Sequence, residues 1–143
     1  MLKGVPAAIS PELMYTLMKM GHGDEIVLAD GNFPADSHAQ RIVRADGLSV
    51  PDVLEAILRF FPLDAYVDAP AFVMQPVPGD PTTPEIWTQF QVLLDSAEGK
   101  EVPVSQVERF AFYEQAKRAY AVVATSETAL YANLILKKGV VLP

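Results

Sequence analysis

Residues 20–35, MGHGDEIVLADGNFPA, place one of the two histidines of the chain between two glycines, directly ahead of an apolar run. An imidazole gains or loses a proton near neutral pH, so His22 is a candidate general acid or base. Gly21 and Gly23 allow backbone conformations closed to other residues, or the close approach of a ligand. Asp30 follows the apolar run at the carboxyl end of an expected strand, where α/β sheets bind ligands. Plainer interpretations remain open: a helix-to-strand connector for His22 and a turn-capping carboxylate for Asp30.

Several kinds of chemistry lack their usual motifs in this sequence. It contains no cysteine, no G-x-S-x-G, no G-x-G-x-x-G after a strand and no phosphate-binding loop. The acidic residues around His22 and His38 match no metal-ligand spacing, so we expect no metal site, and we expect His38 to lie on the surface. The groups that remain are suited to proton transfer: histidines, carboxylates and the tyrosines near the C-terminus.

The elements that must position these groups follow from caps and apolar spacing. Alternating helices and strands predict an α/β sandwich, with a mainly parallel sheet flanked by helices and a single domain over residues 1–143. The strand over residues 25–30 has the unbroken apolar centre of a sheet covered on both faces. Further strands are expected at 41–44, 71–74, 121–125 and 134–136. Helices are expected to begin at 10–12 (SPE), at 49–52 (SVPD), at 83–85 (TPE) and after a capping box at Ser105 and Glu108.

Composition limits the partners of the chain. Its formal net charge of −7 repels phosphate backbones and argues against nucleic-acid binding. No apolar run approaches the roughly 18 residues needed to cross a membrane. The first ten residues, MLKGVPAAIS, lack the hydrophobic core of a signal peptide, which favours the cytoplasm. The methionines, tyrosines and phenylalanines suit either a core or subunit contacts.

Four segments carry a resemblance to a known family. In the order of the chain they are MGHGDEIVLADGNFP, RADGLSVPDVLEAIL, RFAFYEQAK and YANLILKKGV. Over nearly the whole chain they resemble the ribose pyranase and fucose mutarotase family. RFAFYE resembles the fucose branch, because ribose pyranases have a histidine where Arg109 stands. The resemblance implies a ribose pyranase-like fold and an isomerase that interconverts the α and β anomers of L-fucose.

Mutarotation needs one proton removed from the anomeric hydroxyl and one delivered to the ring oxygen, with no cofactor and no metal. The resemblance implies that His22 is the proton donor and that Asp30 binds sugar hydroxyls or steers the histidine. Tyr120 is a weaker candidate, for the apolar wall beside the fucose methyl, and core packing is its alternative. The positions that the resemblance assigns to sugar binding are Asp30, Arg109, Tyr131, Ala132 and Asn133.

The resemblance also implies a homo-oligomer with pockets at subunit contacts. In the family the C-terminal segment of one chain meets the G-H-G turn of another, in a ring-shaped decamer or in smaller assemblies such as a dimer. Two other functions remain open. One is a ribose pyranase, which interconverts pyranose and furanose forms, and the other is a non-catalytic sugar-binding accessory of a transporter. A general acid that reaches the ring oxygen distinguishes an enzyme from a binder, and His22 favours the enzyme.

Overall fold

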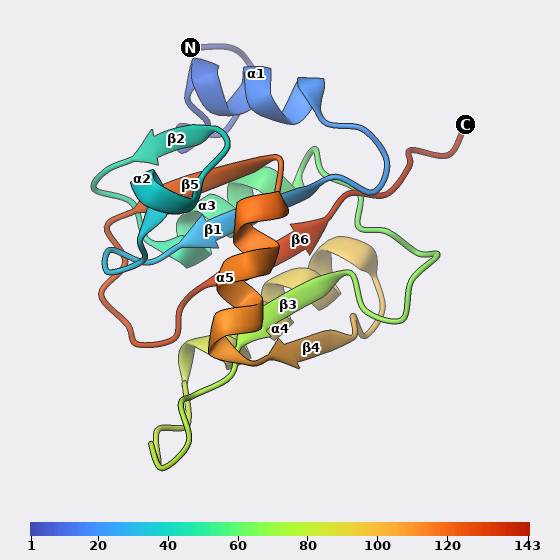
Figure 1. Cartoon of the computed structure of the whole chain (residues 1–143). Helices are drawn as coiled ribbons and strands as arrows, with labels where there is room; N and C mark the ends of the chain where they lie inside the picture. Colours follow the sequence, from blue (N-terminus) through green and yellow to red (C-terminus); the bar gives the residue numbers. More distant parts are fainter.

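Six strands form one sheet in the order β2-β5-β1-β6-β3-β4, in a computed structural model that describes residues 1–143 (Figure 1). β1–β5, β2–β5 and β3–β4 are parallel pairs, whereas β6 runs antiparallel to both of its neighbours, β1 and β3. The expected α/β fold with a mainly parallel sheet is confirmed. The strands are β1 (Glu25–Ala29), β2 (Ile42–Ala45), β3 (Ala71–Met74), β4 (Val104–Val107), β5 (Ala121–Thr125) and β6 (Leu134–Lys137).

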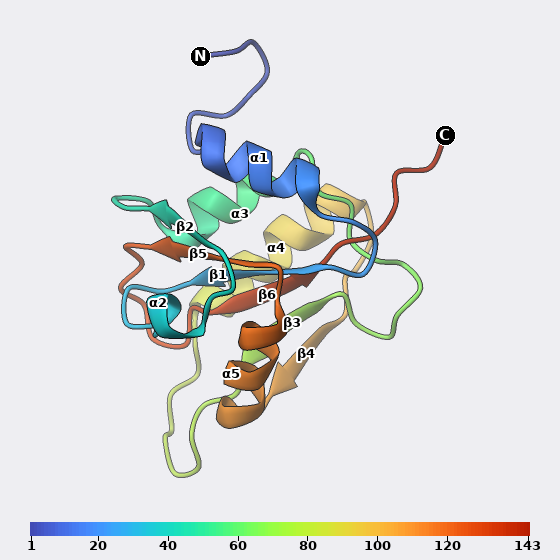
Figure 2. The ribbon, with the colours of Figure 1, turned by 45° about the horizontal axis from the view of Figure 1, so that its top comes forward.

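Helices cover both faces of the sheet: α1, α3 and α4 lie on one side and α2 and α5 on the other (Figure 2). None of them combines the length and the apolar content that crossing a membrane requires. The helices are α1 (Pro11–Lys19), α2 (Ala35–His38), α3 (Val50–Leu58), α4 (Ile86–Glu98) and α5 (Arg109–Arg118).

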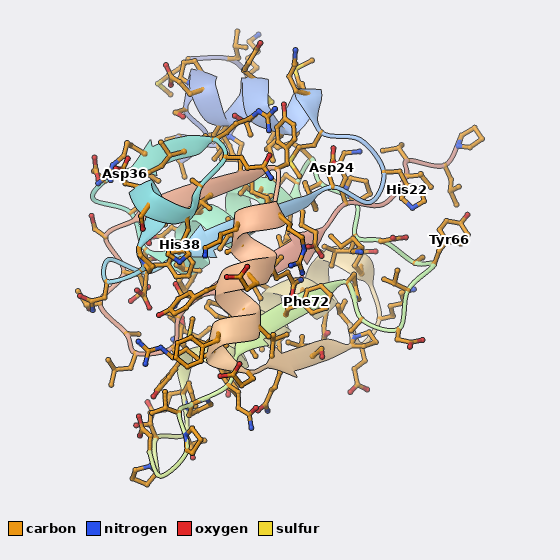
Figure 3. All side chains as sticks on the ribbon, viewed as in Figure 1. His22, Asp24, Asp36, His38, Tyr66 and Phe72 are labelled. Atoms are coloured by element: carbon orange, nitrogen blue, oxygen red, sulfur yellow. The ribbon has the colours of Figure 1, made fainter.

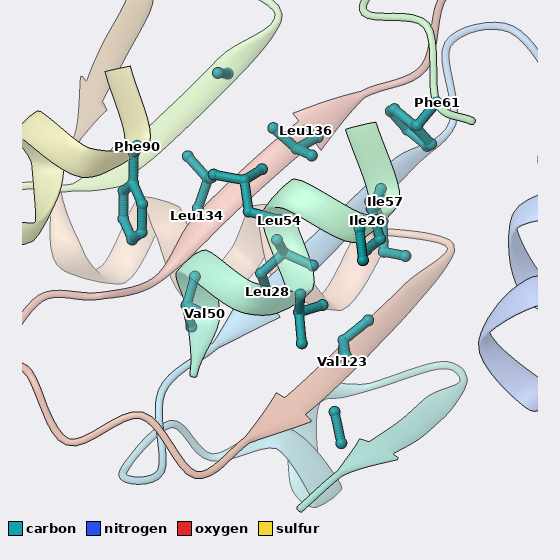
Figure 4. Packing of buried hydrophobic residues seen from close by; sticks show 14 of the residues in the cluster. Ile26, Leu28, Val50, Leu54, Ile57, Phe61, Phe90, Val123, Leu134 and Leu136 are labelled. Atoms are coloured by element: carbon teal, nitrogen blue, oxygen red, sulfur yellow. The ribbon is translucent and has the colours of Figure 1, made fainter. Parts of the chain in front are cut away.

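The two covered faces explain the apolar run of β1. Successive side chains of a strand point to opposite faces, so Ile26 and Leu28 enter the larger core under α3 (Figure 4). Val27 and Ala29 enter the smaller core under α5, beside Phe112. These four of the five β1 residues are fully buried.

Two of the expected helix starts are confirmed at the level of single hydrogen bonds. The Ser10 hydroxyl accepts a bond from Leu13 N at 3.1 Å and begins α1. Ser49 and Asp52 form a capping box at the start of α3. Side-chain acceptors at these positions satisfy backbone N–H groups that have no partner within the helix.

Two other expected caps are wrong. Thr83 does not cap α4, whose N-cap is Glu85, without a side-chain hydrogen bond. Ser105 lies inside β4, and Glu108 itself caps α5 by accepting bonds from Phe110 N and Ala111 N at 2.9 and 3.1 Å. β4 was not expected because it is an edge strand with mostly half-buried residues, so its sequence VSQV lacks an apolar run.

The strand directions decide which loops meet. β1 and β5 end at the same edge of the sheet because they are parallel, and antiparallel β6 begins at that edge. The residues after β1 and those before β6 therefore lie together. Asp30 and Asn133, which are 103 positions apart in the chain, form a hydrogen bond there. The residues before β1 and those after β6 lie at the opposite edge.

Candidate active site

Asp30 and Asn133 form a reciprocal pair at the edge where β1 ends. Asp30 N donates to Asn133 Oδ1 at 2.8 Å, and Asn133 Nδ2 donates to Asp30 Oδ2 at 3.0 Å. Asn32 N donates to the other carboxylate oxygen at 2.9 Å. Burial raises the pKa of the Asp30 carboxyl, and these hydrogen bonds oppose the rise. The carboxylate, only 8% exposed, is held in one orientation.

A cavity of about 410 Å³ opens beside this pair. Its wall combines two carboxylates, a guanidinium and two phenol groups with an apolar side, which suits a ligand that carries several hydroxyls and an apolar group. The lining residues are Asp30, Asn32, Phe33, Met74, Val77, Asp80, Arg109, Tyr113, Leu130, Tyr131 and Asn133.

Tyr131 is fixed on three sides at the rim of this cavity. Its φ of +55° makes it the one non-glycine residue with a left-handed backbone. Its carbonyl accepts from Trp87 Nε1 at 3.0 Å, and its hydroxyl accepts from Val77 N at 3.3 Å and donates to Asp80 Oδ2 at 2.5 Å. The hydrogen bond to the Asp80 carboxylate raises the pKa of the Tyr131 hydroxyl, because that bond exists only while the phenol keeps its proton.

Arg109 and Tyr113 enter the cavity from the first turns of α5. The guanidinium of Arg109 is exposed, with Nε 3.4 Å from Tyr113 Oη and the carbon Cζ 5.6 Å from the centre of the Tyr113 ring. The His38 ring lies 5.3 Å from the Tyr113 ring and 6.2 Å from Phe33. The expectation of a surface position for His38 is therefore only partly right: its side chain is half-buried because α2 packs against α5.

His22 lies at the opposite edge of the sheet from Asp30. The five residues of β1 that separate these two ends span roughly 15 Å at about 3.3 Å per residue. His22 is 47% exposed, its Nε2 is 3.2 Å from Asp64 Oδ1, and its ring lies 5.8 Å from that of Tyr66 (Figure 3). Within one chain the structure does not bring His22 to the Asp30 cavity.

The residues after β6 join His22 to Asp64. Gly23, with φ of +87°, donates its N–H to the carbonyl of Lys138 at 2.8 Å. Gly139 passes so close to the chain at Leu63 that an added Cβ would lie 2.5 Å from the Leu63 carbonyl oxygen and 2.9 Å from Asp64 Cα. The C-terminal segment therefore holds the His22 turn and Asp64 side by side.

Asp64 presents a buried, ionised carboxylate to His22. Its Oδ1 also accepts from Tyr66 N at 3.0 Å, and that bond and the contact with His22 lower the pKa of the carboxyl. A carboxylate hydrogen-bonded to one imidazole nitrogen fixes the ring orientation and leaves the other nitrogen for a ligand. Of the two glycines, only Gly23 needs its conformational freedom here, since Gly21 does not have a positive φ.

The side chains of two sequence candidates do not line the cavity. Tyr120 precedes β5, at the edge where β1 begins, and its ring packs against the Arg41 guanidinium at 4.0 Å. Ala132 is fully buried and belongs to the larger core. No group of three or more His, Asp or Glu side chains is arranged to hold a metal ion.

The sequence did not indicate three polar residues near the two ends of β1: Tyr113 and Asp80 at the cavity, and Asp64 beside His22. Tyr113 follows Arg109 by four residues, so helical spacing alone places both on one face and gave a usable signal. Asp80 stands in a proline-rich loop, and Asp64 follows a leucine after α3. Nothing in the local sequence at these two positions indicates that they reach Tyr131 and His22.

Comparison with known proteins identifies the family. The RbsD / FucU transport protein family matches residues 3–141. The chain belongs to this family. Among RbsD / FucU relatives, it is 58% identical to fucose mutarotase of Homo sapiens, over 97% of this chain and 94% of that protein. It is 52% identical to L-fucose mutarotase of Haemophilus influenzae, over 98% of this chain and 97% of that protein.

A solved RbsD / FucU structure agrees in fold. The crystal structure of the fucose mutarotase in complex with L-fucose from Streptococcus pneumoniae superposes with a TM-score of 0.94. That chain is 49% identical, and the match covers 99% of this chain and 100% of the other. The resemblance carried by the four sequence segments is confirmed.

Proposed function

We propose that this protein is an isomerase that interconverts the α and β anomers of L-fucose by opening and reclosing the sugar ring. The observation that carries the proposal is its full-length similarity, at a TM-score of 0.94, to a fucose mutarotase solved with L-fucose. The fucose mutarotases of Homo sapiens and Haemophilus influenzae support it with 58% and 52% identity over almost the whole chain. The proposed reaction needs an acid and a base but no cofactor.

The cavity residues suit this sugar. Asp30 and Asn133 present fixed hydrogen-bonding groups, and Arg109 supplies donors for the sugar hydroxyls. Phe33 and Met74 give an apolar wall for the methyl group of fucose, which ribose lacks. In this assignment Asp30 binds and orients the sugar before the ring opens, or accepts the anomeric proton itself.

The proposed acid, His22, comes from another copy of the chain. Its own Asp30 cavity lies at the far edge of the sheet, so a shared site in a homo-oligomer brings the two together. Apolar side chains are exposed at both edges: Tyr66 is 73% exposed beside His22, and Phe110 and Leu130 are 67% and 60% exposed near the cavity. Exposed apolar groups at both edges fit a subunit contact, and a dimer or a decamer satisfies this geometry.

Exchange NMR tests the activity directly. With L-fucose at anomeric equilibrium, the NMR signal of one anomer's anomeric proton is saturated. The saturation should transfer to the anomeric proton of the other anomer faster when the protein is present. Ligand contacts with unchanged exchange would instead identify a sugar binder without turnover. Acceleration confined to the pyranose and furanose forms of ribose would identify a pyranase.

Replacing His22 tests its role as the acid. His22→Gln should lower the exchange rate by about 10²–10⁴-fold, the usual contribution of a positioned acid or base. Binding of fucose, measured by titration, should change far less because Asp30, Arg109 and Asn133 remain. Near-normal exchange in a folded variant would make His22 a connector and move the proton donor elsewhere.

A further inference from the structure

The contact between His22 and Asp64 determines which imidazole nitrogen can pass a proton to a ligand. Asp64 Oδ1 lies 3.2 Å from His22 Nε2 and also accepts a hydrogen bond from Tyr66 N at 3.0 Å. The Asp64 side chain is only 4% exposed, and its lowered pKa keeps it ionised at neutral pH, so it accepts hydrogen bonds and donates none. His22 Nε2 therefore carries a proton whenever this contact is made, in the neutral as well as in the charged imidazole.

The other ring nitrogen of His22 is the one left to exchange protons. Nδ1 makes no hydrogen bond within the chain, and the imidazole stands half exposed beside the Tyr66 ring (Figure 3). A neutral imidazole carries its proton on one nitrogen and accepts with the other. Because Nε2 is protonated, Nδ1 is the acceptor of the neutral form and the second donor of the charged form.

Backbone hydrogen bonds from the segment after β6 hold the two side chains at this distance. Asp64 N donates to the Lys137 carbonyl at 3.1 Å, and Gly23 N donates to the Lys138 carbonyl at 2.8 Å. Lys138 N donates in turn to the Asp24 carbonyl at 2.8 Å. The backbone therefore sets the spacing of the carboxylate and the imidazole, and the side-chain hydrogen bond fixes the rotation of the ring.

From this arrangement we infer that Asp64 is a positioning residue of the proposed site: it holds His22 in the Nε2–H form and leaves Nδ1 to meet the sugar bound by another subunit. The inference rests on the proposed function for the ligand and for the shared site. In ring opening, charged His22 gives its Nδ1 proton to the ring oxygen as the bond between C1 and that oxygen breaks. The anomeric hydroxyl loses its proton to the base, and C1 becomes a carbonyl carbon. Reclosure reverses both transfers, while the Nε2 proton stays in its bond to Asp64.

Two substitutions of Asp64 separate the hydrogen-bond acceptor from the charge. Asp64→Ala removes the acceptor, and we expect kcat for anomer exchange to fall about 10²-fold, as when a reacting group is misplaced. KM should change little, because the sugar lies in the cavity of another chain. Asp64→Asn should lose far less, since the Tyr66 N–H keeps the amide oxygen in place to accept from His22 as well. Equal losses in the two variants, or a wild-type kcat in Asp64→Ala, would overturn the inference.

A matched control and a double variant test whether Asp64 acts through His22. Asp68 is an exposed carboxylate in the same loop, so Asp68→Ala should keep the wild-type rate. A loss as large as that of Asp64→Ala would assign the effect to the loop and overturn the inference. Adding Asp64→Ala to His22→Gln should lower kcat no further, because the two residues form one unit. A further loss would show that Asp64 acts apart from His22, which also overturns it.

A second measurement does not depend on catalysis. The ¹⁵N shifts of a neutral imidazole show which nitrogen is protonated, and with only two histidines in the chain, His38→Gln assigns the signals of His22. The wild type should show the Nε2–H form, and Asp64→Ala should show a larger share of the Nδ1–H form. An Nδ1–H form in the wild type, or equal shares in both proteins, would overturn the inference. If the wild-type protein accelerates no exchange, the proposed function fails, and these spectra still decide whether Asp64 fixes the tautomer.

Discussion

Asp30 and His22 are held in opposite ways, and the difference matches their proposed roles. Asp30 is buried and bonded through both carboxylate oxygens, so little conformational entropy remains to be lost when a sugar binds. His22 is half exposed, with one nitrogen bonded to Asp64. An acid that must reach a sugar in another subunit has to stand clear of its own chain.

Asp30→Asn should impair both folding and sugar binding. The new amide can accept from Asn32 N with its oxygen, but its NH₂ group then faces the Asn133 Nδ2 donor. Asn133 cannot turn over without losing its bond from Asp30 N. Two opposed buried donors should cost about 1–3 kcal/mol of unfolding free energy, measured by urea denaturation. Unchanged stability would mean that the pair rearranges; exposed Asp46→Asn is the control.

Glu25 should give the fold a measurable pH dependence. Burial, the dominant cause, raises the pKa of this carboxyl, against the opposing effects of Lys137 and Gln115. A carboxyl whose pKa is higher in the folded than in the unfolded state makes the folded state less stable as pH rises from near 4 through the raised value. Glu25→Gln should remove that loss, so the variant gains stability relative to wild type across this window. Urea midpoints from pH 4 to 7 measure it, and a constant difference would contradict it.

At the scale of elements, the C-terminal segment after β6 acts as a spacer between the His22 turn and Asp64. Only a residue without a Cβ, such as Gly139, can pass this close to the backbone of Leu63 and Asp64. Its N–H donates to the Pro62 carbonyl at 2.8 Å, and Asp64 N donates to the Lys137 carbonyl at 3.1 Å. The relative positions of His22 and Asp64 therefore depend on a backbone contact rather than on either side chain.

Gly139→Ala should separate the two groups. The added Cβ clashes with backbone atoms of Leu63 and Asp64, so the segment must shift, at a cost of about 1–3 kcal/mol. Exchange activity should fall while fucose affinity at the distant cavity is retained. Gly4→Ala is the control, because nothing lies within 4 Å of its Cβ position and it tests only the strain of a positive φ. Full activity of Gly139→Ala would show that the Asp64 contact is dispensable.

Short sequence patterns predicted the elements whose start depends only on residues close in the sequence. Ser10 and Ser49 cap helices because serine oxygens meet nearby N–H groups whatever the rest of the chain does. The Ser105–Glu108 spacing imitates a capping box, but pairing of β4 with β3 decides the structure there. Strand pairing joins residues far apart in sequence, so no local pattern contains it.

The residues of the candidate site also differ in whether a local sequence signal indicates them. His22 and Asp30 stand beside a strand whose apolar run is plain in the sequence, and the C-terminal segment was found through the resemblance. Asp80 and Asp64 became visible only when the folded chain placed them against Tyr131 and His22, 51 and 42 positions away. That the two halves of the proposed site lie at opposite edges also depends on the sheet order.

At the scale of the whole molecule, the proposed shared site predicts that two inactive variants complement each other. His22→Gln chains and Arg109→Ala chains should each lack activity alone. In oligomers assembled from equal amounts of both, about a quarter of the sites should combine an intact His22 with an intact Arg109, whichever closed symmetry applies. Co-expression of the two chains in equal amounts, with a different affinity tag on each to verify mixing, followed by exchange NMR of the unselected oligomers, measures this. No recovery in a verified mixed oligomer would place His22 outside the site.

The position of β6 also bears on how the chain is made. β1, β2 and β5 form one half of the sheet and β3 and β4 the other, and β6 is the strand that pairs with both. During synthesis on the ribosome, the inner edges of β1 and β3 stay unpaired until residues 134–137 emerge. Open strand edges invite association with other chains, so the chain is most vulnerable to aggregation until β6 has emerged and paired with both strands. Asn133, the partner of Asp30, emerges at the same moment, so the sheet closes and the cavity beside Asp30 forms in one late step.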